Sequence, residues 1–244
     1  MRAGWLRLGV GLFFSFALAF GFWRLARSRT VQVFGRLAPR VETAERIVAL
    51  TFDDGPTPER LEELLGPLES RGVRATFFVI GSHLAQNPET GRRLVAAGHE
   101  LGNHTYSHER MILKSPAFVR SEVERTDALI RAAGYRGPIH FRPPFGYKLF
   151  ALPWFLSRTG RTTVTWDLEP DSDAGASAEQ IVTGVRERVR PGSIILLHVW
   201  YPSRGASRAA VPALVDTLRG DGYRFGTVSE LLSLAPVAFS GSDP

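Results

Sequence analysis

The sequence predicts an α/β fold built around a parallel sheet. Seven short runs rich in apolar and β-branched residues alternate with stretches of helical period, which is the pattern of repeated βα units. The chain has 244 residues, a length that single α/β barrels commonly reach. With 44% hydrophobic and 22% charged residues, its composition is that of a globular protein with a sizeable core.

The elements are assigned in chain order from their periodicity and from the turn residues that bound them. The expected strands are 47–52, 75–80, 99–103, 139–141, 162–166, 194–197 and 223–228. The expected helices are 59–71, 89–97, 118–133, 149–157, 177–189 and 207–219. With right-handed crossovers the strands are parallel, so their C-terminal ends open on one common face. Reactive residues are expected to collect there.

The first 30 residues indicate a membrane-targeting segment. Leu8 to Trp23 carries no charge and is flanked by arginines. This run is short for a spanning helix of about 20 residues and long for a signal-peptide core of about 7 to 15. Ala17-Leu18-Ala19 favours cleavage and release, whereas the arginines after Trp23 favour an uncleaved anchor. Both fates remain open, and either one predicts an extracytoplasmic protein.

The domain organisation follows from these patterns. We expect a signal peptide or membrane anchor at 1–30, a linker with at most one short strand at 31–44, a globular domain at 45–235 and a tail at 236–244. The chain has no cysteine, which excludes disulfides and thiolate metal sites.

The charge distribution argues against a nucleic-acid partner. The net charge is +6, but five of the 30 basic side chains lie in the first 30 residues, which leaves 25 against 24 acidic ones. The nearly neutral body offers no basic stripe that could follow a phosphate backbone.

Two adjacent acids, Asp53 and Asp54, follow the first expected strand in the motif T-F-D-D-G-P at 51–56. Neighbouring carboxylates repel each other unless a cation or an arginine stabilises them. The tripeptide Asp-Gly-Pro alone favours a purely structural turn, so the other motifs decide.

Two histidines, His104 and His108, follow the weak third strand in H-T-Y-S-H. On a helical turn this spacing places both imidazoles on one side. With a carboxylate they complete a three-ligand metal site that leaves one position open for water. The spacing alone is weak, but the expected position at the open face of the sheet strengthens it.

Three further segments also follow strands. Arg142 lies in R-P-P-F-G, where prolines fix the backbone and let the guanidinium pair with a carboxylate instead of facing solvent. Four acids occur between 166 and 173, although any loop can be acidic. His198 ends an apolar strand; lone histidines are usually structural, but one at this face is a candidate proton donor.

Together these segments resemble the polysaccharide deacetylase family, also called the NodB-homology or carbohydrate esterase 4 family. The resemblance covers about residues 45–232 and is specific, because the motifs occur in the family's order: T-F-D-D-G-P, H-[ST]-x-x-H, R-x-P-x-G, an acidic segment after a tryptophan, and L-x-H. It implies a distorted (β/α)7 barrel and an enzyme that removes N-acetyl groups from aminosugar polymers or oligomers.

The resemblance also implies residue roles. Asp54, His104 and His108 would hold a divalent metal, most simply Zn²⁺. Asp53 would be the general base and Arg142 would orient it. His198 would be the general acid. Independently of the resemblance, hydrolysis of an amide forms an oxyanion that needs donors, and the backbone N–H of Phe145 on its rigid loop is suited to this.

The sequence departs from the family pattern in two places. Val199 stands where the family usually has an aspartate after the last histidine. The acids of the fourth motif, Glu169, Asp171 and Asp173, lie in a shifted register. The acid that orients His198 is therefore open, and we favour Asp171.

Several aromatic and histidine residues have a plainer interpretation. Trp166, Trp200 and Tyr201 are candidates for walls of a sugar site, although buried aromatics in a barrel are more often core. We expect three histidines to be structural: His83, His99 and His140.

The expected partners are an acetylated glycan and, through the leader, a membrane. Two alternatives remain: the same scaffold acting on another amide or a ureide, and a non-catalytic glycan-binding module at the membrane.

Overall fold

The computed structural model describes residues 2–173 and 175–235, with side chains described from residue 15 onward. The expected tail at 236–244 lies outside the described residues. The helices are α1 (Arg2–Arg27), α2 (Pro58–Glu69), α3 (Gly81–Gln86), α4 (Pro88–Ala96), α5 (Pro116–Ala132), α6 (Ala151–Arg158), α7 (Ala178–Arg186), α8 (Gly205–Gly220) and α9 (Val228–Ser233), with 3-10 turns η1 (Pro144–Gly146) and η2 (Pro202–Arg204). The strands are β1 (Leu37–Ala38), β2 (Ile47–Gly55), β3 (Thr76–Val79), β4 (Glu100–Asn103), β5 (Thr163–Val164), β6 (Ile194–His198) and β7 (Arg224–Gly226).

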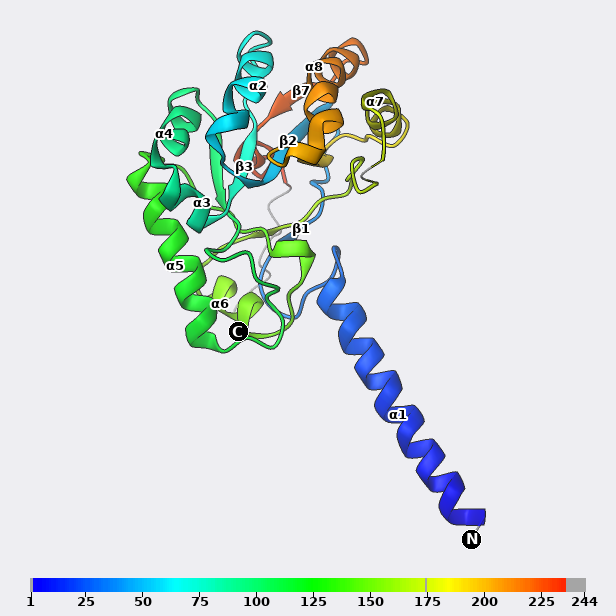
Figure 1. The fold of residues 1–244 in the computed structure, drawn as a ribbon. Coiled ribbons are helices and arrows are strands. Elements are labelled where there is room, and N and C mark those ends of the chain that lie inside the picture. Colours follow the sequence, from blue (N-terminus) through cyan, green and yellow to red (C-terminus); the bar gives the residue numbers. More distant parts are fainter. Residues whose placement is uncertain (1, 174, 236–244) are drawn as a thin grey trace, which may run out of the picture.

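Every ladder between the described strands is parallel, which confirms the predicted α/β fold. Five strands form one sheet in the order β4-β3-β2-β6, with β7 paired to the start of β2, and β1 pairs with β5. Helices α2, α7 and α8 pack over one flank, and α3, α5 and α6 over the other (Figure 1). All nine residues of β2 are buried between them.

Single bridges replace one of the expected strands. At 139–141 only Phe141 pairs in this way, with Asn103 on one side and Thr163 on the other. The prolines at 138, 143 and 144 fix φ and lack an N–H, which keeps this segment from extending as a ladder. Beyond β5, Leu168 bridges Ile195 of β6, so the parallel pairings lead from β4 through these bridges back to β6.

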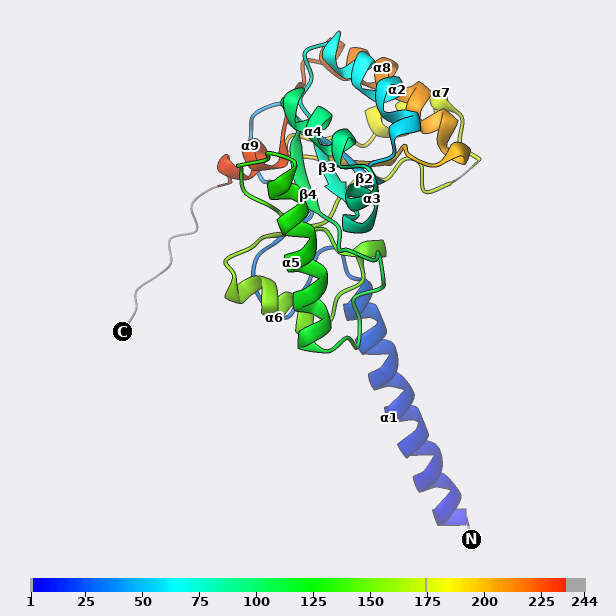
Figure 2. The ribbon, with the colours of Figure 1, turned by 60° about the vertical axis from the view of Figure 1, so that its left-hand side comes forward.

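Residues before the expected domain boundary pack on this body. Helix α1 projects away from it in both views (Figures 1 and 2). From Ala26 onward the chain is bonded to the body: the N–H of Lys148 donates to the Ala26 carbonyl at 2.9 Å, and β1 joins β5. Among the residues whose side chains are described, no helix is both long and apolar enough to cross a membrane.

A close approach at the end of β2 requires glycine at position 55. The indole ring of Trp200 lies against the Gly55 backbone, and a Cβ added there would stand 2.1 Å from that ring. Trp200 is 3% exposed and packs against Phe77, with ring centroids 6.0 Å apart. The absence of a side chain at Gly55 therefore allows Trp200 to fill the core beneath the sheet end.

We predict that Gly55→Ala lowers the free energy of unfolding by about 1–3 kcal/mol, because the new methyl group overpacks the Trp200 site. Gly66→Ala in α2 is the matched control: nothing lies within 4 Å of its added Cβ, and the helix is expected to gain up to about 1 kcal/mol. Denaturant unfolding of both variants measures the effect; equal stability of the two would contradict the packing described.

Candidate active site

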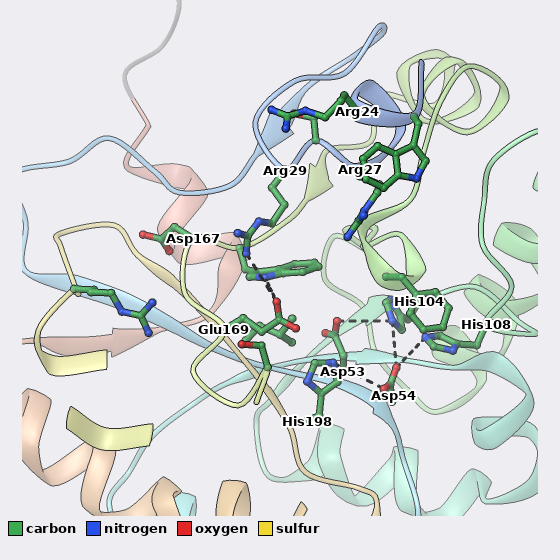
Figure 3. A pocket seen from close by; sticks show the side chains of 17 residues that line it. Arg24, Arg27, Arg29, Asp53, Asp54, His104, His108, Asp167, Glu169 and His198 are labelled. Carbon is green, nitrogen blue, oxygen red and sulfur yellow. Dashed lines mark hydrogen bonds and ion pairs between the residues drawn. The ribbon is translucent and has the colours of Figure 1, made fainter. Parts of the chain in front are cut away.

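The C-terminal ends of the strands meet at one pocket, as the parallel arrangement requires. Asp53 on β2 lies in register with His198 on β6, and Asn103 at the end of β4 bridges Phe141, just before Arg142. The pocket has a volume of about 860 Å³, typical of sites that hold a whole organic ligand. Figure 3 shows Asp53, Asp54, His104, His108 and His198 close together in this pocket.

A β-bulge directs two neighbouring acids to the same place. Successive side chains of a regular strand point to opposite faces. The pairing of β2 with β3 shifts its register between Asp53 and Gly55, and Asp54 has a φ of 74°. Both carboxylates therefore line the pocket, although they are only 2% and 6% exposed.

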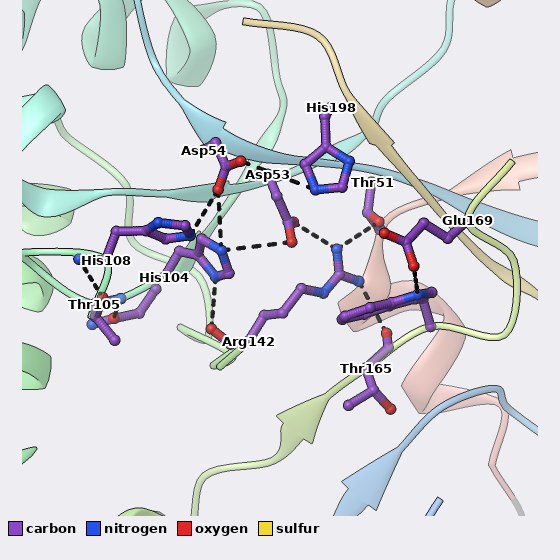
Figure 4. A network of polar contacts seen from close by, with 12 residues as sticks. Thr51, Asp53, Asp54, His104, Thr105, His108, Arg142, Thr165, Glu169 and His198 are labelled. Atoms are coloured by element: carbon purple, nitrogen blue, oxygen red, sulfur yellow. Dashed lines mark hydrogen bonds and ion pairs between the residues drawn. The ribbon is translucent and has the colours of Figure 1, made fainter. Parts of the chain in front are cut away.

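Asp54, His104 and His108 form a compact three-ligand cluster. One ligand atom from each lies within 4.8 Å of the others. The Asp54 Oδ1 atom is 3.4 Å from His104 Nε2 and 3.0 Å from His108 Nε2 (Figure 4). Burial raises the pKa of the Asp54 carboxyl, but the two imidazoles outweigh it and hold that pKa well below its ordinary value.

The tautomer of His104 suits a metal ligand. Its Nδ1 lies 2.7 Å from the Arg142 carbonyl oxygen, which can only accept, so Nδ1 carries the proton. The Nε2 lone pair is then directed at Asp54 and is available to a cation. One carboxylate and two imidazoles at this spacing fit a divalent ion such as Zn²⁺.

The two histidines do not lie on a helical turn, contrary to the sequence-based expectation. Residues 104–110 form an irregular loop in which Thr105 and His108 have φ values of 68° and 59°. Side chains hold it in place of helical bonds: Glu122 of α5 accepts hydrogen bonds from the N–H groups of Tyr106 and Ser107 at 3.0 and 2.8 Å. Conformational strain of this kind is often found at ligand sites.

Asp53 is bound to a buried arginine. Arg142 Nη1 donates to Asp53 Oδ1 at 2.7 Å and to the Thr51 hydroxyl at 2.8 Å, and Nη2 donates to the Thr165 carbonyl at 3.0 Å (Figure 4). The Arg142 guanidinium lies 4.0 Å from the centre of the Phe78 ring. One oxygen of Asp53 is therefore fixed, and the other lies 3.7 Å from His104 Nε2 at the cluster.

His198 is held by Asp171, the acid favoured from the sequence. The backbone N–H of His198 donates to Asp171 Oδ2 at 2.7 Å, and the ring Nδ1 of His198 lies 3.3 Å from Asp171 Oδ1. Burial lowers the pKa of the His198 ring, but Asp171 and the charges of Asp53 and Asp54 outweigh burial and raise it to about 9. The His198 Nε2 faces the pocket, 4.0 Å from Asp54 Oδ2.

The aromatic residues considered for the substrate site differ in whether they line the pocket. Phe145 is 55% exposed at the pocket, and among the described residues none accepts its backbone N–H. Trp166 lines the pocket and donates its indole N–H to Glu169 at 2.9 Å. Trp200 lies in the core instead of the pocket, because Gly55 leaves room for its ring there. Tyr201 is 40% exposed outside the pocket lining.

Several supporting residues were not expected from the sequence. They include Thr51 and Glu122, described above, and Ser207, whose hydroxyl donates to Asp171 at 2.8 Å. His83, expected to be structural, bonds through Nδ1 to the Asp54 carbonyl at 3.0 Å. These contacts join positions far apart in the chain, and no local motif signals them.

Buried histidines elsewhere are neutral: desolvation lowers the pKa of His99 to about 4.

Known proteins share both the sequence and the fold. A sequence profile of the polysaccharide deacetylase family matches residues 40–164. The chitooligosaccharide deacetylase of Bradyrhizobium sp. (strain ANU 289) is 36% identical over 198 residues, which cover 76% of this chain and 90% of that protein. The peptidoglycan-N-acetylglucosamine deacetylase of Bacillus cereus (strain ATCC 14579) is 34% identical over 200 residues, covering 81% and 93%.

Solved structures agree with these matches. The family 4 carbohydrate esterase from Streptomyces lividans, in complex with acetate, has a TM-score of 0.71 and 37% identity, covering 80% of this chain and 99% of that one. A family pseudoenzyme from Bacillus anthracis has a TM-score of 0.73 and 25% identity, covering 86% and 71%. The matches confirm the enzyme class expected from the motifs. The chain therefore belongs to the polysaccharide deacetylase family.

Proposed function

We propose that this chain hydrolyses the N-acetyl groups of aminosugars in a glycan polymer or oligomer and releases acetate. The observation that carries the proposal is the convergence of a possible metal-ligand cluster, a second acid and a histidine held by Asp171 in one pocket. The named deacetylase activities of the relatives support this substrate class. The scaffold we propose is a distorted (β/α)7 barrel, which the ring of parallel pairings and single bridges supports.

The cluster of Asp54, His104 and His108 would hold the metal, and we propose Zn²⁺. A bound divalent ion polarises the amide carbonyl and lowers the pKa of water to about 7. The same donor set accepts other divalent ions, so the choice of zinc rests on the two imidazoles and the three-ligand geometry.

The other residues have complementary tasks. Asp53, fixed through one oxygen by Arg142, takes the proton of the attacking water with its free oxygen. The Phe145 N–H donates to the oxyanion that forms on the carbonyl oxygen. His198, kept protonated by Asp171, gives its Nε2 proton to the departing amine. Without that proton the tetrahedral intermediate expels water instead of the amine.

We also propose an extracytoplasmic location. The uncharged run from Leu8 to Trp23 between flanking arginines supports a signal peptide or an anchor. An acetylated wall or matrix glycan would then be within reach of the pocket.

The zinc-loaded chain is expected to release acetate from at least one of three substrates: chitin oligomers, peptidoglycan or poly-N-acetylglucosamine. Asp53→Asn should lower the rate by about 10² to 10⁴, because an amide cannot accept the proton. Asp173→Asn, an exposed acid outside the pocket lining, is the control and should retain the parent rate. No acetate from any of these glycans with metal bound, or an active Asp53→Asn chain, would refute the proposal.

Removal of one ligand should abolish tight metal binding. We expect Asp54→Asn and His104→Ala to weaken Zn²⁺ binding by more than about a hundred-fold, because even residues behind metal ligands contribute about 10- to 100-fold. Elemental analysis after dialysis, and competition with a chromophoric chelator, would measure this. Retention of one zinc per chain by His104→Ala with the parent affinity would contradict the assignment.

The pH dependence should move when Asp171 is changed. A general acid must be protonated, so activity is lost as pH rises through the pKa of His198. Asp171 raises that pKa, so Asp171→Asn lowers it, and the alkaline limb of the rate profile should shift to lower pH. An unchanged alkaline limb in the variant, measured by acetate release from pH 6 to 10, would exclude His198 as the group responsible.

A further inference from the structure

One wall of the pocket comes from chain that precedes the matched family region. The family profile begins at residue 40, yet Trp23, Arg27 and Arg29 line the same pocket as the metal-ligand cluster. Figure 3 shows Arg27 reaching toward His104 and Arg29 directed at Glu169. The end of α1 is therefore part of the substrate site, and its arginines face the reacting groups.

This wall is fixed to the body by hydrogen bonds. The backbone N–H of Lys148 donates to the Ala26 carbonyl at 2.9 Å, and the buried Lys148 ammonium donates to the Ser28 carbonyl. The Thr165 hydroxyl donates to the Arg29 carbonyl at 2.7 Å. The Arg27 guanidinium lies 4.6 Å from the centre of the Trp23 ring. The arginines are thus held over the pocket by the fold.

The positive charges of the wall are available to a ligand. Within the described part of the chain, Arg27 and Arg188 form no ion pair, and Arg188, which lies outside the leader, lines the same pocket. Arg29 has a long contact of 3.9 Å to Glu169. All three arginines are exposed.

The acids of the same pocket are already engaged at its floor. Asp53 pairs with Arg142, and Asp54 with the two histidines. Asp167 accepts hydrogen bonds from the Ser193 hydroxyl and the Ile194 N–H, both at 2.8 Å, and Glu169 accepts the Trp166 indole. Each of these acids therefore already has partners within the protein, whereas Arg27 and Arg188 have no acidic partner among the described residues.

We propose that Arg27, Arg29 and Arg188 select a glycan that carries carboxylate groups near the N-acetylated sugar. This inference rests on the proposed function and names its substrate class. Guanidinium groups bind carboxylates through paired N–H donors. The same charges repel the amine that deacetylation creates, which favours release of the product.

Arginines that follow a membrane-targeting segment can also bind the headgroups of anionic lipids, which is the alternative to a glycan carboxylate. The glycan is favoured here because these side chains line the pocket that contains the metal-ligand cluster, together with Arg188 from the turn after α7. The experiment below separates the two.

The test compares one oligomer in two charge states. An oligomer of alternating N-acetylglucosamine and N-acetylmuramic acid carries a carboxylate on every second sugar, and its methyl ester removes only that charge. Binding of each to the full-length, zinc-loaded Asp53→Asn chain is measured by calorimetry at low and high salt. The same is done with Arg27→Gln and Arg29→Gln combined, and with Arg120→Gln, an exposed arginine of α5 outside the pocket, as the control.

We expect the acid to bind at least about five-fold more tightly than the ester at low salt, with the preference falling as salt rises. The double variant should lower the ratio at least about two-fold while Arg188 keeps part of the preference, and Arg120→Gln should leave the ratio unchanged. Equal binding of acid and ester by the parent chain, or a preference that is undiminished in the double variant, would overturn the inference.

Turnover of the parent chain separates this inference from the proposed function. Charge-selective binding without acetate release from either oligomer would refute deacetylation but would still support carboxylate binding by the arginines. Acetate release from both oligomers at equal kcat/KM, without a binding preference, would refute only the proposed carboxylate selection by the arginines. A double variant that loses binding to phosphatidylglycerol vesicles but keeps the acid-to-ester ratio would assign the arginines to a membrane and overturn the inference.

Discussion

Two neighbouring carboxylates, Asp53 and Asp54, are buried at the end of one strand, and each requires its own positive partner. Charges removed from water are tolerated only when they are paired and hydrogen-bonded. The Arg142 guanidinium pairs with Asp53, and the imidazoles of His104 and His108 contact Asp54. The bulge keeps both acids at the pocket while separating their partners. Because the partners are separate, Asp54 can bind a cation while Asp53 stays able to accept a proton.

The parts of the structure that local patterns specify were predictable. The buried strand before Asp53 and the parallel order of the sheet follow from apolar runs alternating with helical periods. Because parallel strands end on one face, residues directly after strands converge, and this brings Asp54, His104 and His108 together. The capping box of Thr227 and Glu230 was also visible in the sequence and marks α9, which periodicity alone missed.

Other features depend on contacts that no local pattern encodes. Trp200 resembled a sugar-binding aromatic, but the space over Gly55 is created by folding and holds it in the core. The loop of His104 was expected to be helical; Glu122, from a helix later in the chain, holds an irregular conformation there. The end of α1 belongs to the expected leader, and there the carbonyl of Ala26 accepts a hydrogen bond from the distant backbone N–H of Lys148. In each case long-range packing outweighed local propensity.

The central claim is that Asp54, His104 and His108 share one cation beside the unliganded Asp53. Anomalous diffraction at the zinc edge, from crystals of the zinc-loaded chain, tests it most directly. The account predicts one strong peak about 2.0–2.2 Å from an Asp54 oxygen and from Nε2 of both histidines, with no Asp53 oxygen at that distance. A peak at other residues, or Asp53 as a ligand in place of Asp54, would contradict it.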